Sequence, residues 1–105
     1  MTETDAVFAA LSDPTRREVM RRLSERGPST LGDLSVELPV SRQAVAKHLV
    51  VLEEAGLVAA TGETRRRRYQ LTPRPLADAM DWMVDVGAEW DARLDALRRH
   101  VERGH

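Results

Sequence analysis

The stretch SRQAVAKHLVVLEEAGLV, residues 41–58, contains the clearest indication of how this chain folds. Its apolar residues recur at helical spacing and share one face: Val45, Leu49 and Leu52. Ser41 is a favourable N-cap, and Gly56 fits the position just past a helix C-terminus. The pattern therefore predicts a helix over residues 42–55 whose apolar face packs against the rest of the chain.

The opposite face of this helix carries polar side chains near its N-terminal end. Arg42, Gln43 and Lys47 lie there, with the small Ala46 among them. In the DNA major groove an arginine bonds guanine through two hydrogen bonds, and a glutamine does the same for adenine. A residue as small as alanine lets a helix approach closely and offers a methyl group to thymine. Because many surface helices carry such residues, the neighbouring segments are needed to assign a role.

Three further helices are predicted before this one. The first covers residues 5–11. The second covers residues 14–26 and begins after Asp13, a favourable N-cap that is followed by proline. The third is short, residues 30–38, with Thr30 as its N-cap. A glycine–proline pair ends the second helix, and a proline ends the third.

After the helix at 42–55 the apolar period changes from helical to alternating. Residues 57–61 and 67–71 read as two short strands, and Gly62 supports a hairpin turn between them. Four consecutive arginines lie in this hairpin: Arg65, Arg66, Arg67 and Arg68. Arginines that contact phosphate groups attract DNA without reading its base sequence. The hairpin is therefore expected to contact a nucleic-acid backbone.

The four arginines cannot all face one ligand, because strand residues alternate between two faces. Alternation sends Arg67 and Tyr69 to one face and the flanking arginines to the other. We expect at least one of the four to lie over the domain or to pair with a nearby carboxylate. The candidates are Glu53, Glu54 and Glu63.

The order helix, short helix, turn, capped helix and hairpin is that of a winged helix-turn-helix, a mainly α fold with a small β-hairpin. In such a unit the recognition helix, here residues 42–55, enters the DNA major groove. The hairpin, or wing, follows the phosphate backbone or the minor groove. The sequence therefore predicts one domain over residues 1–105 that binds double-stranded DNA.

Residues 74–103 are predicted to form one long helix. Its apolar positions follow one another at steps of three or four, close to a heptad repeat. A helix of ~45 Å outruns a domain of this size, so we expect part of it to meet a second copy in a two-fold dimer. The expected interface comprises Val7, Phe8, Leu11, Trp82, Val86, Trp90, Leu94, Leu97 and Val101.

The net charge of the 105 residues is −1, but the charge is unevenly distributed. Residues 41–70 hold six basic and three acidic side chains, whereas residues 78–102 hold three basic and seven acidic ones. This split suggests one surface for a polyanion and another remote from it. The chain has no cysteine and no apolar run of ~18 residues. With an acidic N-terminus unlike a secretory signal, it is expected to be cytoplasmic, without disulfides or a membrane segment.

The chain resembles the ArsR/SmtB family of small dimeric winged-helix regulators. Three stretches and the tryptophan-containing last helix carry the resemblance: FAALSDPTRREVMRRL, SRQAVAKHLVVLEEAGLV and RRRRYQL. It implies a cytoplasmic homodimer that represses transcription by covering its operator, with the first and last helices at the dimer interface. Together with the residue patterns, it leads to an expected DNA-contacting set: Thr30, Ser41, Arg42, Gln43, Ala46, Lys47, His48, Arg65, Arg66, Arg67 and Arg68.

The chain departs from the metal-sensing members of that family. Those members carry a cysteine pair in the third helix, where this chain has TLGDLS, residues 30–35. Others bind zinc between the last helices, but here that helix offers Asp85 and Glu89, with His100 far along from both. Because carboxylates alone are poor selective ligands for zinc or copper, we expect no metal site, no cofactor and no metal response. No nucleophile triad, carboxylate pair or glycine-rich loop suggests an enzyme.

Other interpretations remain open. Winged helices also bind acidic proteins, so the domain is alternatively a protein-interaction module. A repressor of this kind is alternatively released by a small organic inducer bound near Trp82 and Trp90. For His48, at the edge of the recognition helix, a packed histidine and a phosphate contact are equally compatible with the pattern. A two-fold dimer would present its recognition helices ~34 Å apart, which predicts an imperfect inverted-repeat operator.

Overall fold

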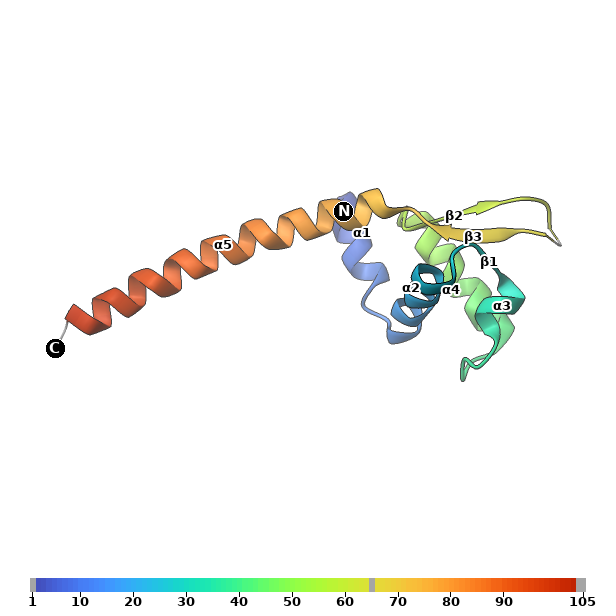
Figure 1. Cartoon of the computed structure of the whole chain (residues 1–105), viewed down its shortest axis with the longest axis horizontal. Coiled ribbons are helices and arrows are strands. Elements are labelled where there is room, and N and C mark those ends of the chain that lie inside the picture. The colour runs from blue at the N-terminus through green and yellow to red at the C-terminus, as the bar shows by residue number, and fades with distance from the viewer. Residues whose placement is uncertain (1, 65, 104–105) are drawn as a thin grey trace.

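Five helices and three short strands make up residues 2–64 and 66–103, the part of the chain that the computed structural model describes. They are α1 (Glu3–Ala10), α2 (Pro14–Arg26), β1 (Ser29–Thr30), α3 (Leu31–Ser35), α4 (Arg42–Glu54), β2 (Val58–Thr61), β3 (Arg68–Leu71) and α5 (Pro73–Arg103). Figure 1 shows α1 to α4 and the strands gathered at one end of the molecule, with α5 leading away. The predicted mainly helical fold with a small β-sheet is confirmed.

Predicted N-cap residues stand at the start of α2 and of α4. The Asp13 carboxylate accepts hydrogen bonds from the backbone N–H groups of Thr15, at 2.7 Å, and Arg16, at 3.2 Å. Partial desolvation raises the pKa of Asp13, but these backbone hydrogen bonds, together with nearby positive charge, outweigh it and the net pKa is lowered. The Ser41 hydroxyl accepts a hydrogen bond from the N–H of Ala44 at 3.1 Å, and α4 starts at Arg42, the residue after Ser41.

Two helix boundaries differ from the prediction by two residues or more. The first helix starts two residues earlier than expected, because Thr2 and Asp5 exchange hydrogen bonds in a capping box. The third helix ends at Ser35 instead of residue 38, because Val36 is extended and Glu37 has a positive φ of 68°. A non-glycine residue in this left-handed region is uncommon, and here it turns the chain toward α4.

The strands form an antiparallel sheet in the order β1-β3-β2. The hairpin of β2 and β3 matches the predicted wing, and Gly62 in its turn has a φ of 89°. In addition, Ser29 pairs with Tyr69, so β1 joins the sheet. The prediction missed β1, because a two-residue strand is too short to show a period. Its pairing ties the start of α3 directly to the wing.

The core lies between helices α1 to α4 and the sheet. Its largest fully buried side chains are Leu34, Leu49, Leu52, Leu57, Val7, Val19 and Val45. The predicted inward face of the recognition helix is therefore confirmed. Val7 has no exposed surface, which corrects its place in the expected dimer interface, since a side chain enclosed by its own core cannot touch a partner.

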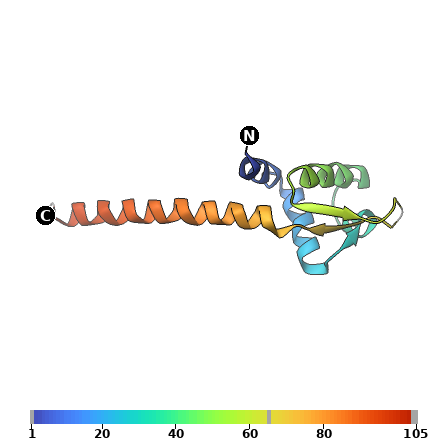
Figure 2. The ribbon, with the colours of Figure 1, turned by 90° about the horizontal axis from the view of Figure 1, so that it is seen from above.

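The helix α5 extends far beyond the body of the domain. The molecule including this helix measures 69 × 26 × 24 Å along its principal axes. Figure 2 shows the helix leaving along one line, with α1 beside its first part. There Phe8 meets Trp82 edge to face, with the ring centroids 5.5 Å apart. Beyond this contact apolar side chains are at least half exposed: Trp90, Leu94, Leu97 and Val101. No helix among the described residues is long and apolar enough to cross a membrane.

Candidate nucleic-acid interface

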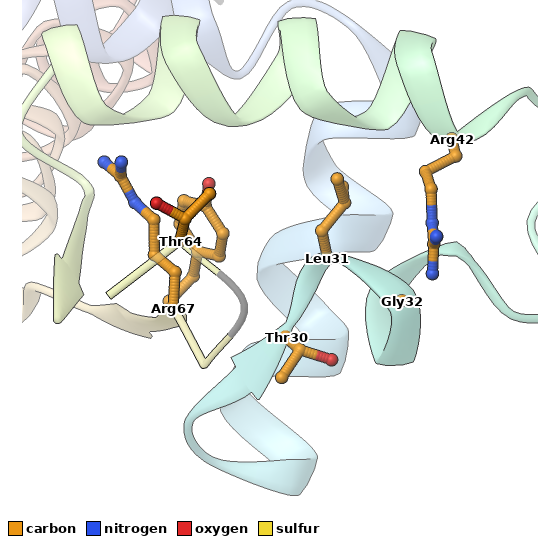
Figure 3. Close-up of a pocket in the computed structure, with 7 residues that line it drawn as sticks. Thr30, Leu31, Gly32, Arg42, Thr64 and Arg67 are labelled. Atoms are coloured by element: carbon orange, nitrogen blue, oxygen red, sulfur yellow. The ribbon is translucent and has the colours of Figure 1, made fainter. Parts of the chain in front are cut away.

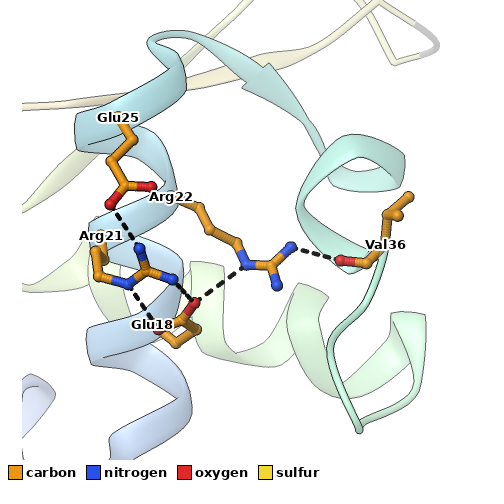
Figure 4. Close-up of polar contacts among 5 residues, drawn as sticks. All are labelled: Glu18, Arg21, Arg22, Glu25 and Val36. Atoms are coloured by element: carbon orange, nitrogen blue, oxygen red, sulfur yellow. Dashed lines mark hydrogen bonds and ion pairs between the residues drawn. The ribbon is translucent and has the colours of Figure 1, made fainter.

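The turn between α3 and α4 is held by a buried arginine of α2. Arg22 is only 8% exposed, and its Nη1 donates a hydrogen bond to the carbonyl of Val36, just past the end of α3. Its Nε lies 3.4 Å from the Glu18 carboxylate, an ion pair without hydrogen-bond geometry. Figure 4 shows Arg22 reaching across to the turn while the adjacent Arg21 stays on α2 with Glu18 and Glu25.

The start of α3 is fixed by a second capping box. The Thr30 hydroxyl accepts from the N–H of Asp33, and the Asp33 carboxylate accepts from the N–H of Thr30, both at 3.1 Å. The backbone N–H of Thr30 first, and then its side chain, lower the pKa of the Asp33 carboxyl. The hydroxyl of Thr30, predicted to contact DNA, is therefore engaged in the cap, as is that of Ser41 at the start of α4.

The outer face of α4 presents the predicted base-reading side chains. Arg42, Gln43 and Lys47 are exposed near its N-terminal end, and Ala46 is half-buried beside them. The opposite face of the same helix is completely buried. The buried face fixes the rotation of α4 about its axis, so these polar groups are held on the surface beside the wing.

A cleft of about 340 Å³ separates this end of α4 from the wing. It is lined by Thr30, Leu31, Gly32, Arg42, Thr64, Arg67 and Tyr69. Figure 3 shows Arg42 at the α4 side of the cleft, pointing toward Gly32, while Arg67 and Thr64 belong to the wing side. The cleft therefore brings the wing together with α3 and α4 and places a guanidinium group on each of two sides.

The wing arginines differ in their surroundings. Arg66, Arg67 and Arg68 are all exposed, whereas Arg65 lies outside the described residues. Arg67 has two partners within the domain. Its Nη2 lies 3.4 Å from the Glu53 carboxylate, and its guanidinium lies 5.6 Å from the centre of the Tyr69 ring. The prediction that at least one wing arginine pairs with a carboxylate of this region is confirmed.

His48 faces the neighbouring helices. It is half-buried, and its Nδ1 lies 3.3 Å from Nη1 of Arg16. Because a guanidinium group can only donate, this nitrogen is the acceptor. Arg16 also donates to the carbonyl groups of Ala9 and Ala10 at the end of α1. Of the two interpretations of His48, the structure supports the partner-bonded histidine.

Three residues of this surface were not singled out from the sequence. No local pattern pointed to Arg16, because its partners lie on α1 and α4. The helical spacing could have pointed to Arg22, since this residue falls three positions after the buried Val19 on the inner face of α2. Gly32 could have been found as well, because glycine inside a helix is unfavourable and calls for a packing reason. Within residues 2–64 and 66–103, no three His, Asp or Glu side chains lie close enough together to hold a metal ion.

Comparisons with known proteins agree with this geometry. A family description of a helix-turn-helix domain matches residues 11–60. The chain is 48% identical over 98 residues to the HTH-type transcriptional regulator Rv2034 of Mycobacterium tuberculosis, covering 93% of this chain and 88% of that protein. It is 33% identical over 97 residues to the arsenical resistance operon repressor of Escherichia coli, covering 92% and 83%. A solved ArsR-like transcriptional regulator from Rhodococcus superimposes with a TM-score of 0.78 at 42% identity, covering 92% of this chain and 91% of that one.

Proposed function

Since the chain belongs to the ArsR family of DNA-binding winged helix-turn-helix transcriptional regulators, which are not enzymes, we propose that it is a homodimeric repressor of an inverted-repeat operator. The protein-interaction interpretation has no comparable support, because the related proteins are transcriptional regulators. Acting on DNA also agrees with a cytoplasmic location.

The observation that carries the proposal is the division of α4 into two faces. Val45, Leu49 and Leu52 are completely buried, so the helix cannot rotate without opening the core. Gln43 and Lys47 are thereby held outward. A helix fixed in this way can place an amide against an adenine edge and an ammonium group against a phosphate.

The dimer is proposed from the exposed apolar side chains of α5. Trp90, Leu94 and Leu97 are each more than half exposed and share one side of the helix. A soluble monomer rarely leaves so long an apolar stripe in water, and two-fold pairing would cover it. Phe8, Leu11, Trp82, Val86 and Val101 complete the proposed interface. A two-fold dimer places the recognition helices ~34 Å apart, the spacing of successive major-groove faces.

Repression without a metal is the regulatory part of the proposal. The Escherichia coli relative is a repressor, and covering an operator needs no surface beyond the DNA-binding face and the dimer. Since the chain has no cysteine, a thiolate metal site of its own is impossible. DNA binding by the purified protein is therefore expected to be unaffected by a chelator.

The test is fluorescence anisotropy with a labelled duplex from upstream of the gene for this protein. Binding should be tighter than to random duplex, should weaken steeply with salt and should ignore EDTA. Gln43→Ala is expected to lose ~1–3 kcal/mol on the operator and to relax the preference at one base pair. Equal affinity of the native protein for every duplex of that region would contradict operator recognition there.

A small organic inducer is a second part of the proposal, favoured by one cavity. It encloses about 420 Å³ between α1 and α5 and is lined by Thr2, Thr4, Asp5, Phe8 and Trp82. Because Phe8 and Trp82 also belong to the proposed interface, a ligand there would alter the dimer and hence the spacing of the recognition helices. Ligand titrations that follow tryptophan emission, repeated with Trp82→Phe, test it. A response that persists in the variant would place the ligand elsewhere.

A further inference from the structure

Arg42 is directed differently from the other polar residues of α4. Its guanidinium turns back toward α3: Nη2 lies 2.6 Å from the point that a Cβ on Gly32 would occupy (Figure 3). Any larger residue at position 32 would have to displace this group. Glycine, an unfavourable residue inside a helix, thus makes room here for the arginine.

The position of this guanidinium matches a backbone contact better than a base contact. It lies in the wall of the cleft between α3, α4 and the wing, together with Thr30 and Thr64. On the other side of the cleft Arg67 is partly neutralised by Glu53. No carboxylate among the described residues forms an ion pair with Arg42, so its charge is available to a ligand.

We infer that Arg42 binds a DNA phosphate in the cleft between α3, α4 and the wing rather than reading a base, and that the missing side chain of Gly32 leaves the room it needs in this position. The inference rests on the proposed function, because the phosphate belongs to the DNA that α4 enters. Its chemistry is that of a phosphate monoanion in a duplex backbone, held by a guanidinium group. Base reading then falls to Gln43 and its neighbours further out on α4.

The experiment measures binding of a random 20-base-pair duplex across a series of salt concentrations. Each lost phosphate contact lowers the salt slope by roughly 0.9. Arg42→Ala should lower the slope by about one and weaken binding about five- to tenfold at 0.1 M salt. The control Arg103→Ala, which removes the same charge from the far end of α5, should leave both unchanged. Loss of preference at one operator base pair with unchanged random-duplex binding would show a base contact and overturn the inference.

Gly32→Ala tests the positioning without removing a charge. Alanine is the better helix former, so the variant should melt at or above the temperature of the native protein. Its Cβ should nevertheless push Arg42 aside and weaken binding to all duplexes severalfold, with little further loss when Arg42→Ala is added. Native affinity in Gly32→Ala would overturn the role of Gly32.

A free anion is the other source of the same chemistry. Inorganic phosphate is added at constant ionic strength while the amide signals of residues 32 and 42 are followed by NMR. The expected result is no saturable shift in the low millimolar range. Saturable binding there would assign the cleft to a free anion and overturn the DNA contact. If the native protein bound no duplex at all, the proposed function would fail and this inference with it, whereas a normal salt slope in Arg42→Ala would remove the inference alone.

Discussion

At the scale of single residues, adjacent arginines of α2 have unlike roles. Arg22 is buried and holds the α3–α4 turn through the Val36 carbonyl, whereas the Arg21 side chain is 56% exposed and pairs with Glu18 and Glu25 on the surface. Exposed ion pairs contribute little to stability, because water already solvates both charges. Hydrogen bonds from a buried charged group contribute more, because losing them leaves a partner unpaired.

This contrast makes a stability prediction. Arg22→Met keeps much of the apolar stem but removes the donors, and should lower the free energy of unfolding by ~1–3 kcal/mol in urea titrations. Arg21→Met, the matched control, should cost less than ~1 kcal/mol. Equal losses in the two variants would mean that the contact with Val36 does not stabilise the turn.

The capping carboxylate of α3 makes stability depend on pH. The pKa of Asp33 is lowered from its ordinary value of 3.8, mainly by the Thr30 N–H, with the Thr30 hydroxyl and nearby arginines contributing. Because the folded-state pKa lies below the unfolded one, the cap stabilises fully above the unfolded value and loses its effect as the pH falls through the folded one.

Asp33→Asn provides the test, because its side chain does not titrate. The native protein should be the more stable of the two near pH 7, and the difference in melting temperature should shrink as the pH falls below 3.8. Other acidic groups titrate equally in both proteins and cancel in the difference. A difference in melting temperature that stays constant down to pH 2.5 would mean that ionisation of Asp33 does not contribute to the cap.

At the scale of elements, the wing is joined to α4 through Arg67. Its ion pair with Glu53 links the residue just before β3 to the recognition helix, and its guanidinium lies over the Tyr69 ring. Because the pair is largely exposed, it adds little to stability, but it partly neutralises one positive charge of the wing. Glu53 therefore limits the attraction of the wing for phosphate.

Glu53→Gln should strengthen DNA binding. Freed from the carboxylate, Arg67 can reach a phosphate, so random-duplex affinity should rise severalfold and the salt slope should steepen by up to about one. Glu54→Gln makes the same change of charge one residue away and is the control. If both variants strengthened binding equally in anisotropy titrations, the effect would be one of net charge and not of Arg67.

At the scale of the whole molecule, α5 extends past the domain with one apolar and one acidic side. Leu94 is 52% exposed, and Ala92 lies on the other side of the same helix turn. An unpaired carboxylate enclosed in an apolar interface costs several kcal/mol. The same carboxylate facing water costs almost nothing.

Leu94→Glu should therefore weaken the proposed dimer at least tenfold, by ~1.4 kcal/mol or more. Ala92→Glu adds the same side chain on the outer side and should leave the association unchanged. Sedimentation at several protein concentrations distinguishes the two. A native protein that sediments as a monomer at all concentrations would contradict the dimer itself.

Much of the architecture follows from local patterns. Asp13, Thr30 and Ser41 cap the helices as predicted, and the apolar spacing of α4 identified its buried face. These features depend on residues a few positions apart, so periodicity and cap chemistry suffice to find them. The prediction missed the start of α1, which a reciprocal cap sets, and the end of α3, which a left-handed residue sets. It also missed the two-residue β1, which exists only because a distant strand pairs with it.

The directions of the long arginine side chains required the folded chain. The sequence does not show which groups the guanidinium ends of Arg16, Arg22, Arg42 and Arg67 reach. One bonds helix ends and His48, one holds a turn, one lies over Gly32 and one pairs with Glu53. A guanidinium on a flexible stem takes whichever acceptor or space the packing of distant elements brings near it. Local sequence therefore established the helices and the wing, and their packing assigned each arginine its place.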